Sequence, residues 1–205
     1  MSKNKDVKSM LKDAMVLVVI TLISGLILGF VQELTKEPIR IQQEKAVQKA
    51  CQAVFAQAQS FEILKYEPTE MLSEVLKEEG VTIGAVFAAL DNSGNQIGYV
   101  VETSSSEGYG GNIVLYAGIT KDGVLNGISI LSIAETPGLG MNAESVLVPQ
   151  FENVVATQFT YTKTGSTKED EIDAISGATI TTKAIVNAVN GAVRIVTEDL
   201  LKEGN

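Results

Sequence analysis

The residues of this chain best suited to chemistry lie between Asp173 and Thr182, in the run DAISGATITT. They stand just ahead of an amphipathic helical pattern, where the first backbone N–H groups of a helix lack intrahelical partners. Gly177 permits a tight backbone bend, and Ala178 keeps the approach open. The run also supplies four hydroxyl groups, those of Ser176, Thr179, Thr181 and Thr182. Backbone donors and the helix dipole would hold a phosphate there, although the same residues could simply cap a helix.

Two glycine-rich segments could contribute to the same site. One is Gly108–Gly111 (GYGG), which leads into an apolar run, and the other is Glu135–Gly140 (ETPGLG), which follows one. A glycine beside an aromatic residue lets backbone amides approach a ring or a phosphate closely. Taken singly, the first segment could be a flexible turn and the second a rigid loop shaped by Pro137.

With Asp173 three residues ahead of Ser176, the hydroxyl-rich run matches the pattern D-x-x-[ST]-G-A-[TS]. It resembles the FMN-binding domain shared by the G subunit of the Rnf complex and the C subunit of the Na-translocating NADH:quinone reductase. The two glycine-rich segments resemble the same domain, in the family's order and behind one apolar N-terminal stretch. The resemblance extends over nearly the whole chain and is strongest from Gly108 onward.

The resemblance implies that FMN is joined to Thr179 through a phosphoester bond. The hydroxyl-rich run would add five further contacts: Asp173, Ser176, Gly177, Ala178 and Thr182. Tyr109 and Gly110 would lie at the flavin site, and four residues would line the isoalloxazine: Glu135, Thr136, Leu139 and Gly140. Asp173 would recognise or position the cofactor, unless it is a solvated carboxylate of the acidic run 169–173.

Composition excludes several kinds of redox and catalytic centre. The chain has no histidine, no tryptophan and one cysteine among its 205 residues. A zinc site, a haem, an iron–sulfur cluster or a Ser-His-Asp triad cannot be expected from it alone, so no metal ligands are predicted. Electrons would have to be carried by an organic cofactor. Because no histidine can activate Thr179, the resemblance implies a separate Mg²⁺-dependent flavin transferase, which in the family uses FAD as the FMN donor.

Charge is unevenly placed along the chain, whose formal net charge is −9. Residues 1–40 hold six Lys and Arg against four Asp and Glu, whereas residues 41–205 hold ten against twenty-one. An acidic domain of this kind is repelled by phosphate backbones, so nucleic acid is not expected as a partner. Cys51, the single cysteine, is expected to pack as a small apolar side chain.

An uncharged run of eighteen residues, Ala14–Val31, is just long enough to span a bilayer. Four lysines precede it, at positions 3, 5, 8 and 12, whereas Lys36 and Arg40 are the only cations in the ten residues that follow it. The positive-inside rule then places residues 1–13 in the cytoplasm and the chain after residue 31 outside the cell membrane. A cleavable signal peptide is the alternative, but the apolar run exceeds the usual length and no A-x-A cleavage site follows.

The remaining patterns predict an α+β domain. Residues 32–80 form a helical connector and domain start, containing a strand over 61–66 and a helix over 69–79 capped by Thr69. The FMN-binding domain is expected over 81–205, where four apolar runs rich in β-branched residues predict strands: 83–90, 97–103, 112–119 and 124–133. Hairpin signals at Asp91–Gly94 and Lys121–Gly123 favour an antiparallel sheet. Four predicted segments follow the strands: a weak helix over 142–155, a loop or edge strand over 156–170, a return to the sheet over 172–175 and a last helix over 180–201.

With the apolar span and the α+β pattern, the family resemblance implies an electron-relay subunit of a membrane-bound, ion-translocating ferredoxin:NAD⁺ oxidoreductase, the Rnf complex. The subunit would not be catalytic alone, and its partners would be the other Rnf subunits, the flavin transferase and the lipid bilayer. Two redox alternatives remain open, the quinone-reductase counterpart and a stand-alone flavin relay. A non-redox alternative is an anchored binding or sensor domain without flavin.

Overall fold

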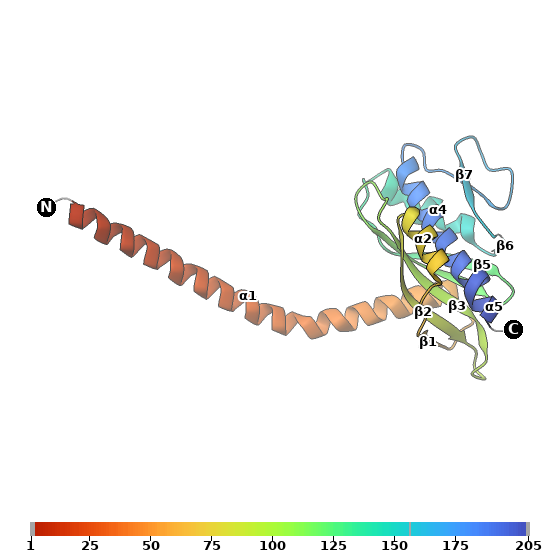
Figure 1. Cartoon of the computed structure of the whole chain (residues 1–205), viewed down its shortest axis with the longest axis horizontal. Coiled ribbons are helices and arrows are strands. Elements are labelled where there is room, and N and C mark those ends of the chain that lie inside the picture. Colours follow the sequence, from red (N-terminus) through yellow and green to blue (C-terminus); the bar gives the residue numbers. More distant parts are fainter. Residues whose placement is uncertain (1–2, 156, 204–205) are drawn as a thin grey trace. The chain divides into compact units, whose positions relative to one another are not determined.

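The structure is a computed structural model that describes residues 3–155 and 157–203. It contains two compact units, Met1–Lys45 and Ala46–Asn205 (Figure 1). Residues 1–2, 156 and 204–205 lie outside the described residues; they belong to the predicted cytoplasmic end, the 156–170 loop and the end of the domain.

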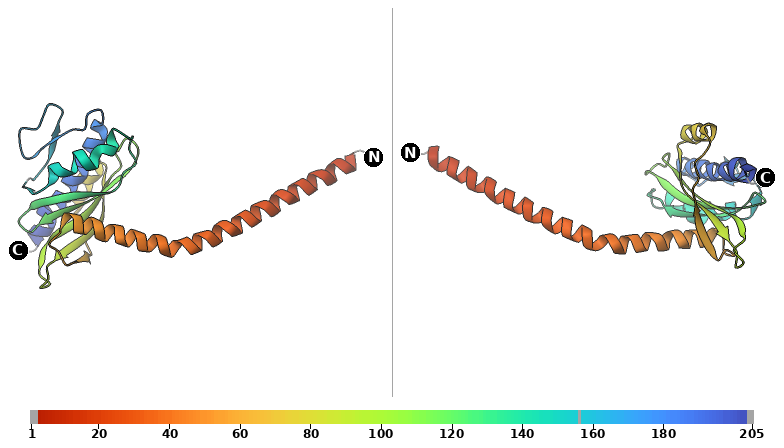
Figure 2. Two further views of the ribbon diagram at one scale, coloured as in Figure 1. Left: turned by 180° about the vertical axis from the view of Figure 1, so that it is seen from behind. Right: turned by 60° about the horizontal axis from the view of Figure 1, so that its bottom comes forward.

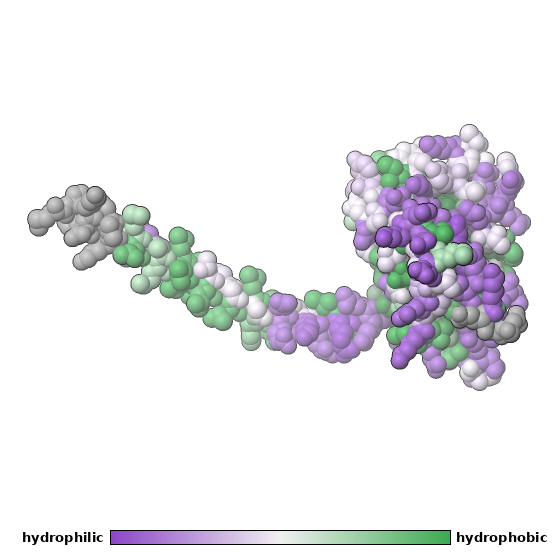
Figure 3. All heavy atoms as spheres, in the orientation of Figure 1, coloured by the Kyte–Doolittle hydropathy of each residue, from purple (hydrophilic) through white to green (hydrophobic). Residues whose placement is uncertain are grey.

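The first unit is helical throughout its described part and belongs to helix α1 (Lys3–Val54), which continues through Pro38. Large apolar side chains are exposed from Met10 to Val31, and Figure 3 shows them as a green band followed by mostly purple residues along the helix. Within the described residues, α1 is the one helix long and apolar enough to cross a membrane, with a mean hydropathy of 2.8 over an 18-residue window. The predicted span over 14–31 lies inside it.

The second unit is built on a six-stranded sheet whose strands run in sequence order and pair antiparallel throughout. The strands are β1 (Ser60–Leu64), β2 (Val81–Leu90), β3 (Gln96–Ser105), β4 (Ile113–Thr120), β5 (Val124–Ser132) and β6 (Val154–Val155). The Asp91 carboxylate accepts the N–H groups of Ser93 and Asn95 at 2.7 and 2.9 Å, which fixes the β2–β3 turn. The predicted antiparallel sheet with flanking helices is thus confirmed.

Both faces of the sheet are covered, because side chains alternate between its faces along each strand. Val101 and Leu115 face helix α4 (Thr179–Arg194) in the main core, and the neighbouring Val100 and Tyr116 face the end of α1. Figure 2 shows α4 and the end of α1 on opposite sides of the sheet. The end of α1 brings Cys51 into this second cluster, where the thiol-bearing side chain is buried as expected.

The segment 172–175 does not return to the main sheet, so that prediction is wrong. β8 (Glu171–Asp173) pairs in parallel with β7 (Thr160–Thr162) in a separate two-stranded sheet. Its remaining backbone groups find a side-chain partner, because the Asp173 N–H donates to Gln150 Oε1 at 2.7 Å and Gln150 Nε2 donates to the Asp173 carbonyl at 3.2 Å. The edge of β5 is meanwhile occupied by β6.

The helices differ from the expectation mainly at their ends. α2 (Glu70–Glu78) follows Thr69, but the Thr69 hydroxyl does not cap it; the Thr69 N–H instead donates to the buried Asp199 carboxylate. The last helix begins at Thr179 and passes into a π-helical segment, η3 (Ile195–Leu200), and then α5 (Leu201–Glu203). The weak helix over 142–155 is split into short turns, namely η1 (Gly140–Asn142), α3 (Ala143–Val146) and η2 (Val148–Phe151), with Pro149 near the start of η2.

Candidate functional site

The three segments identified in the sequence meet around one cavity of about 560 Å³. It lies at the N-terminus of α4, between the loop after β3 and the loop after β5. Its lining comprises Tyr109, Glu135, Thr136, Leu139, Gly140, Gly177, Ala178, Thr179, Ile180 and Thr181. Eight of the twelve predicted site residues are therefore brought together, and Gly110, Asp173, Ser176 and Thr182 stand outside the lining.

The start of α4 presents unpaired backbone donors to this cavity. Gly177 has a φ of +77°, a conformation that glycine adopts without strain, and the Ala178 N–H closes the turn onto the Ile175 carbonyl at 3.0 Å. Within the described residues, the N–H groups of Thr179, Ile180 and Thr181 donate no hydrogen bond, and no side chain caps the helix. Three free donors and the positive end of a sixteen-residue helix can hold a phosphate.

The hydroxyl groups of the run occupy different environments. Thr179 is half-buried and lines the cavity. Thr182 is buried and saturated, because its Oγ1 donates to the Ala178 carbonyl at 3.0 Å and accepts the Ile175 N–H at 3.1 Å. Ser176 is exposed outside the lining. Thr181, expected only as a hydroxyl of the helix start, lines the cavity together with Ile180. Helical spacing alone could not have identified either residue as part of the cavity lining.

The two glycine-rich loops are fitted closely to each other. The Gly110 N–H donates to Glu135 Oε1 at 3.3 Å, and a Cβ on Gly110 would collide with the Ala134 carbonyl. Gly110 therefore permits the contact between the loops rather than lining the cavity. Gly140 is similar, since a Cβ there would stand 2.7 Å from both Glu135 Cβ and Thr181 Oγ1. Glu135 itself is buried, whereas Tyr109 at the cavity rim is 72% exposed.

Asp173 is placed beside the loop that precedes it, and not at the cavity. Its carboxylate accepts the N–H and the hydroxyl of Ser166, and its backbone is held by Gln150 as described above. Lys183, one turn after Thr179, forms an exposed ion pair of 2.8 Å with Glu107, next to the GYGG segment. The hydrogen bond and the charge of Glu107 raise the pKa of Lys183 above its ordinary value.

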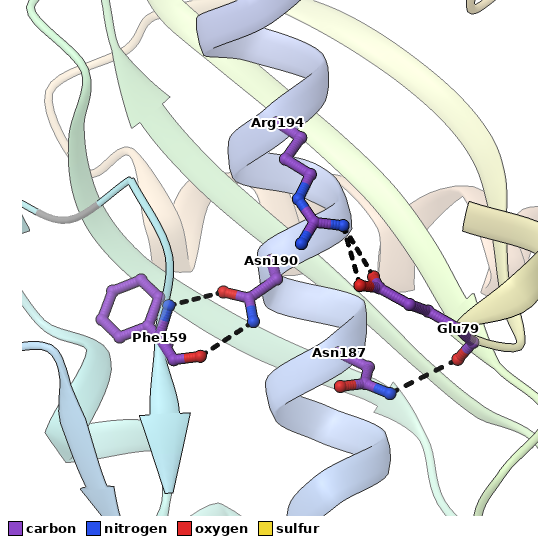
Figure 4. A network of polar contacts seen from close by, with 5 residues as sticks. All are labelled: Glu79, Phe159, Asn187, Asn190 and Arg194. Carbon is purple, nitrogen blue, oxygen red and sulfur yellow. Dashed lines mark hydrogen bonds and ion pairs between the residues drawn. The ribbon is translucent and has the colours of Figure 1, made fainter. Parts of the chain in front are cut away.

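Helix α4 is fixed at its middle and end by polar contacts, which Figure 4 shows. Asn190 Oδ1 accepts the Phe159 N–H at 2.7 Å, and Asn190 Nδ2 donates to the Phe159 carbonyl at 2.9 Å. Arg194 Nη1 donates to both carboxylate oxygens of Glu79 at 2.9 Å. Asn187 adds a longer bond of 3.4 Å to the Glu79 carbonyl. Phe159 and Glu79 therefore hold the middle and end of α4 in place from two sides.

This arrangement fits a flavin mononucleotide. The free N–H groups and the helix dipole suit the phosphate, and Thr179 lines the same cavity. The two closely fitted loops form a side of the cavity against which a planar ring can pack. Glu135 and Thr181 supply polar groups among the mostly small or apolar lining residues.

Comparison with known proteins agrees with this interpretation. Residues 108–194 match the family model of the FMN-binding domain, and residues 1–54 match that of the RnfG N-terminal region. The G subunit of the Na⁺-translocating ferredoxin:NAD⁺ oxidoreductase complex of Acetobacterium woodii is 33% identical over 193 residues, 93% of each chain. The G subunit of the ion-translocating oxidoreductase complex of Methanosarcina acetivorans is 30% identical over 93% of this chain and 96% of its own.

Two further similarities complete the comparison. The G subunit of the proton-translocating ferredoxin:NAD⁺ oxidoreductase complex of Clostridium ljungdahlii is 32% identical over 96% of this chain and 97% of its own. The crystal structure of Shewanella oneidensis NqrC aligns with a TM-score of 0.48 at 21% identity, over 58% of this chain and 61% of that one. On the sequence similarity over nearly its full length, the chain belongs to the family of Rnf complex G subunits.

Proposed function

We propose that this chain is a single-pass membrane subunit of an Rnf-type oxidoreductase complex, and that it carries electrons on FMN bound through a phosphoester to Thr179. The observation that carries the proposal is the position of Thr179. Its hydroxyl group lies at the start of α4, beside three unpaired N–H groups and within a cavity formed by all three sequence segments.

In this proposal FMN supplies the electron-transfer chemistry when bound, and the protein holds it in place. The N-terminus of α4 would stabilise the charge of the phosphate, and the loops that carry Tyr109 and Glu135 would confine the ring. For attachment, Thr179 would supply the oxygen that bonds to the FMN phosphorus, the pyrophosphate bond of FAD would break with AMP as the leaving group, and a base of the flavin transferase would take the hydroxyl proton. This chain contains no histidine that could serve as that base.

The apolar span of α1 supports membrane attachment, and the four lysines before that span support a cytoplasmic N-terminus and an extracytoplasmic domain. Full-length similarity to Rnf G subunits favours the Rnf complex over the quinone-reductase counterpart and over a stand-alone relay. Relatives named for sodium translocation and for proton translocation have similar sequence identity to this chain, so the proposal names no coupling ion.

Tyr109, Leu139 and Ile180 form an exposed apolar rim through which a partner subunit could approach the flavin.

The test is the replacement of Thr179 by Val in the full-length chain co-expressed with a matching flavin transferase. Valine keeps the branched shape but removes the nucleophile, so the protein should reach the membrane without the mass of FMN and without in-gel flavin fluorescence. Ser176→Ala is the matched control, because it removes an exposed hydroxyl from the same motif outside the cavity, and it should retain flavin. An FMN adduct that survives in Thr179→Val, or that maps to another residue by mass spectrometry, contradicts the assignment.

The same preparation tests the non-redox alternative. Flavin absorbance that stays with the denatured wild-type polypeptide indicates a covalent flavoprotein. A wild-type chain that carries no flavin after co-expression would favour the binding or sensor domain instead.

A further inference from the structure

The hydroxyl group of Thr181 is unusual among the buried polar groups of this protein. Thr181 is only 1% exposed and lines the cavity, yet its hydroxyl has no hydrogen-bond partner in the part of the chain that the structure describes. The next residue shows the contrast. The equally buried Thr182 hydroxyl both donates and accepts a bond within the protein.

The Thr181 oxygen is not enclosed in the core, because the residue lines the cavity, so a molecule in that cavity can supply the hydrogen bond that the described residues do not. Thr103 also lacks a partner, but it is enclosed within β3 and lines none of the described cavities. Thr181 differs because it borders a space of ligand size. Gly140 keeps the place beside it open, since any Cβ on that residue would stand 2.7 Å from Thr181 Oγ1.

We propose that the Thr181 hydroxyl hydrogen-bonds a polar atom of the flavin beyond its phosphate, and thereby fixes how the tethered cofactor lies in the cavity. The inference rests on the proposed function of Thr179. A phosphoester holds only one end of the cofactor, and the ribityl chain between phosphate and ring rotates freely. Noncovalent contacts must therefore orient the ring, and Thr181 offers a preformed donor and acceptor two residues from the attachment point.

If Thr181 has this role, two results are expected for Thr181→Val, a substitution that removes the hydroxyl and keeps the branched shape. In the flavin-free chain no bond is lost, so the urea midpoint should stay the same or rise. In the flavin-loaded chain FMN should remain on Thr179, but flavin fluorescence anisotropy should fall because the ring is less restrained. Thr181→Ser, which keeps a hydroxyl, should restore the wild-type anisotropy.

A noncovalent measurement adds a readout that is independent of the covalent bond. In the Thr179→Val background, the full-length chain in detergent is titrated with free FMN, and a second Thr181→Val change should weaken binding about three- to tenfold, the effect of one hydrogen bond. Thr182→Val in the same background is the control. It breaks bonds inside the protein, so it should lower the urea midpoint of the flavin-free chain.

The outcomes separate this inference from the proposed function. Wild-type chain without an FMN adduct refutes the proposed function, and the titration with free FMN still tests Thr181. If the adduct is present but Thr181→Val leaves anisotropy and FMN affinity unchanged, the inference about Thr181 is wrong. It is also wrong if Thr181→Val lowers the flavin-free urea midpoint as much as Thr182→Val, because the hydroxyl would then serve the fold.

Discussion

The polar contacts of helix α4 predict a difference between two asparagines three residues apart. Asn190 is 4% exposed and satisfies both backbone groups of the buried Phe159, whereas Asn187 is half-buried and makes one long bond to the Glu79 carbonyl (Figure 4). Asn190→Ala leaves two buried backbone groups without partners, each at a cost of about 1–3 kcal/mol. The free energy of unfolding should therefore fall by about 3 kcal/mol, a large share of the stability of an ordinary domain.

Asn187→Ala is the matched control on the same helix. It loses one weak bond and gains helix propensity, so its effect should stay below about 1 kcal/mol. Urea unfolding of the extramembrane domain measures both variants, and hydrogen exchange at the Phe159 amide locates the effect. Exchange there should accelerate strongly in Asn190→Ala and little in Asn187→Ala. Equal losses of stability, or an unchanged Phe159 amide, would show that these bonds do not hold the β7 segment to α4.

Three further predictions concern the cavity, the second core and the membrane. Gly140→Val should lower stability and disturb flavin fluorescence while the adduct mass remains, because even a Cβ would stand 2.7 Å from Glu135 Cβ; wild-type fluorescence would remove this loop from the site. Burial and the hydrogen bond to Glu102 raise the pKa of Tyr116 far above its ordinary value, so its contribution to stability should decline only above about pH 10. Wild type and Tyr116→Phe should accordingly show equal tyrosinate absorbance until alkaline unfolding. Protease should cut residues 32–205 in right-side-out vesicles, and cleavage confined to inside-out vesicles would reverse the topology.

The sheet could be predicted from the sequence because its signals are local. Adjacent residues such as Val100 and Val101 are both apolar since each face of the sheet is covered, and turn residues such as Asp91 mark the hairpins. The pairing of β7 with β8 has no such signal. Both strands are only three residues long. Asp173 is also held by the side chain of Gln150, 23 positions away, and a periodic sequence pattern cannot predict such a contact.

The candidate site is predictable for a different reason, and less completely. Nothing in the spacing of the three segments indicates that they meet; that expectation comes from the family resemblance. Within the hydroxyl-rich run, residue type alone cannot separate Thr181 from Thr182, since both are threonines in the first turn of α4. Successive helix residues point about 100° apart. That rotation turns the Thr182 hydroxyl back to the Ile175 and Ala178 backbone, where it stabilises the helix start, and leaves the Thr181 hydroxyl beside the cavity without a partner among the described residues. In this turn, Thr182 therefore stabilises the fold and Thr181 is available to the cofactor, because the helix directs the two side chains to different sides.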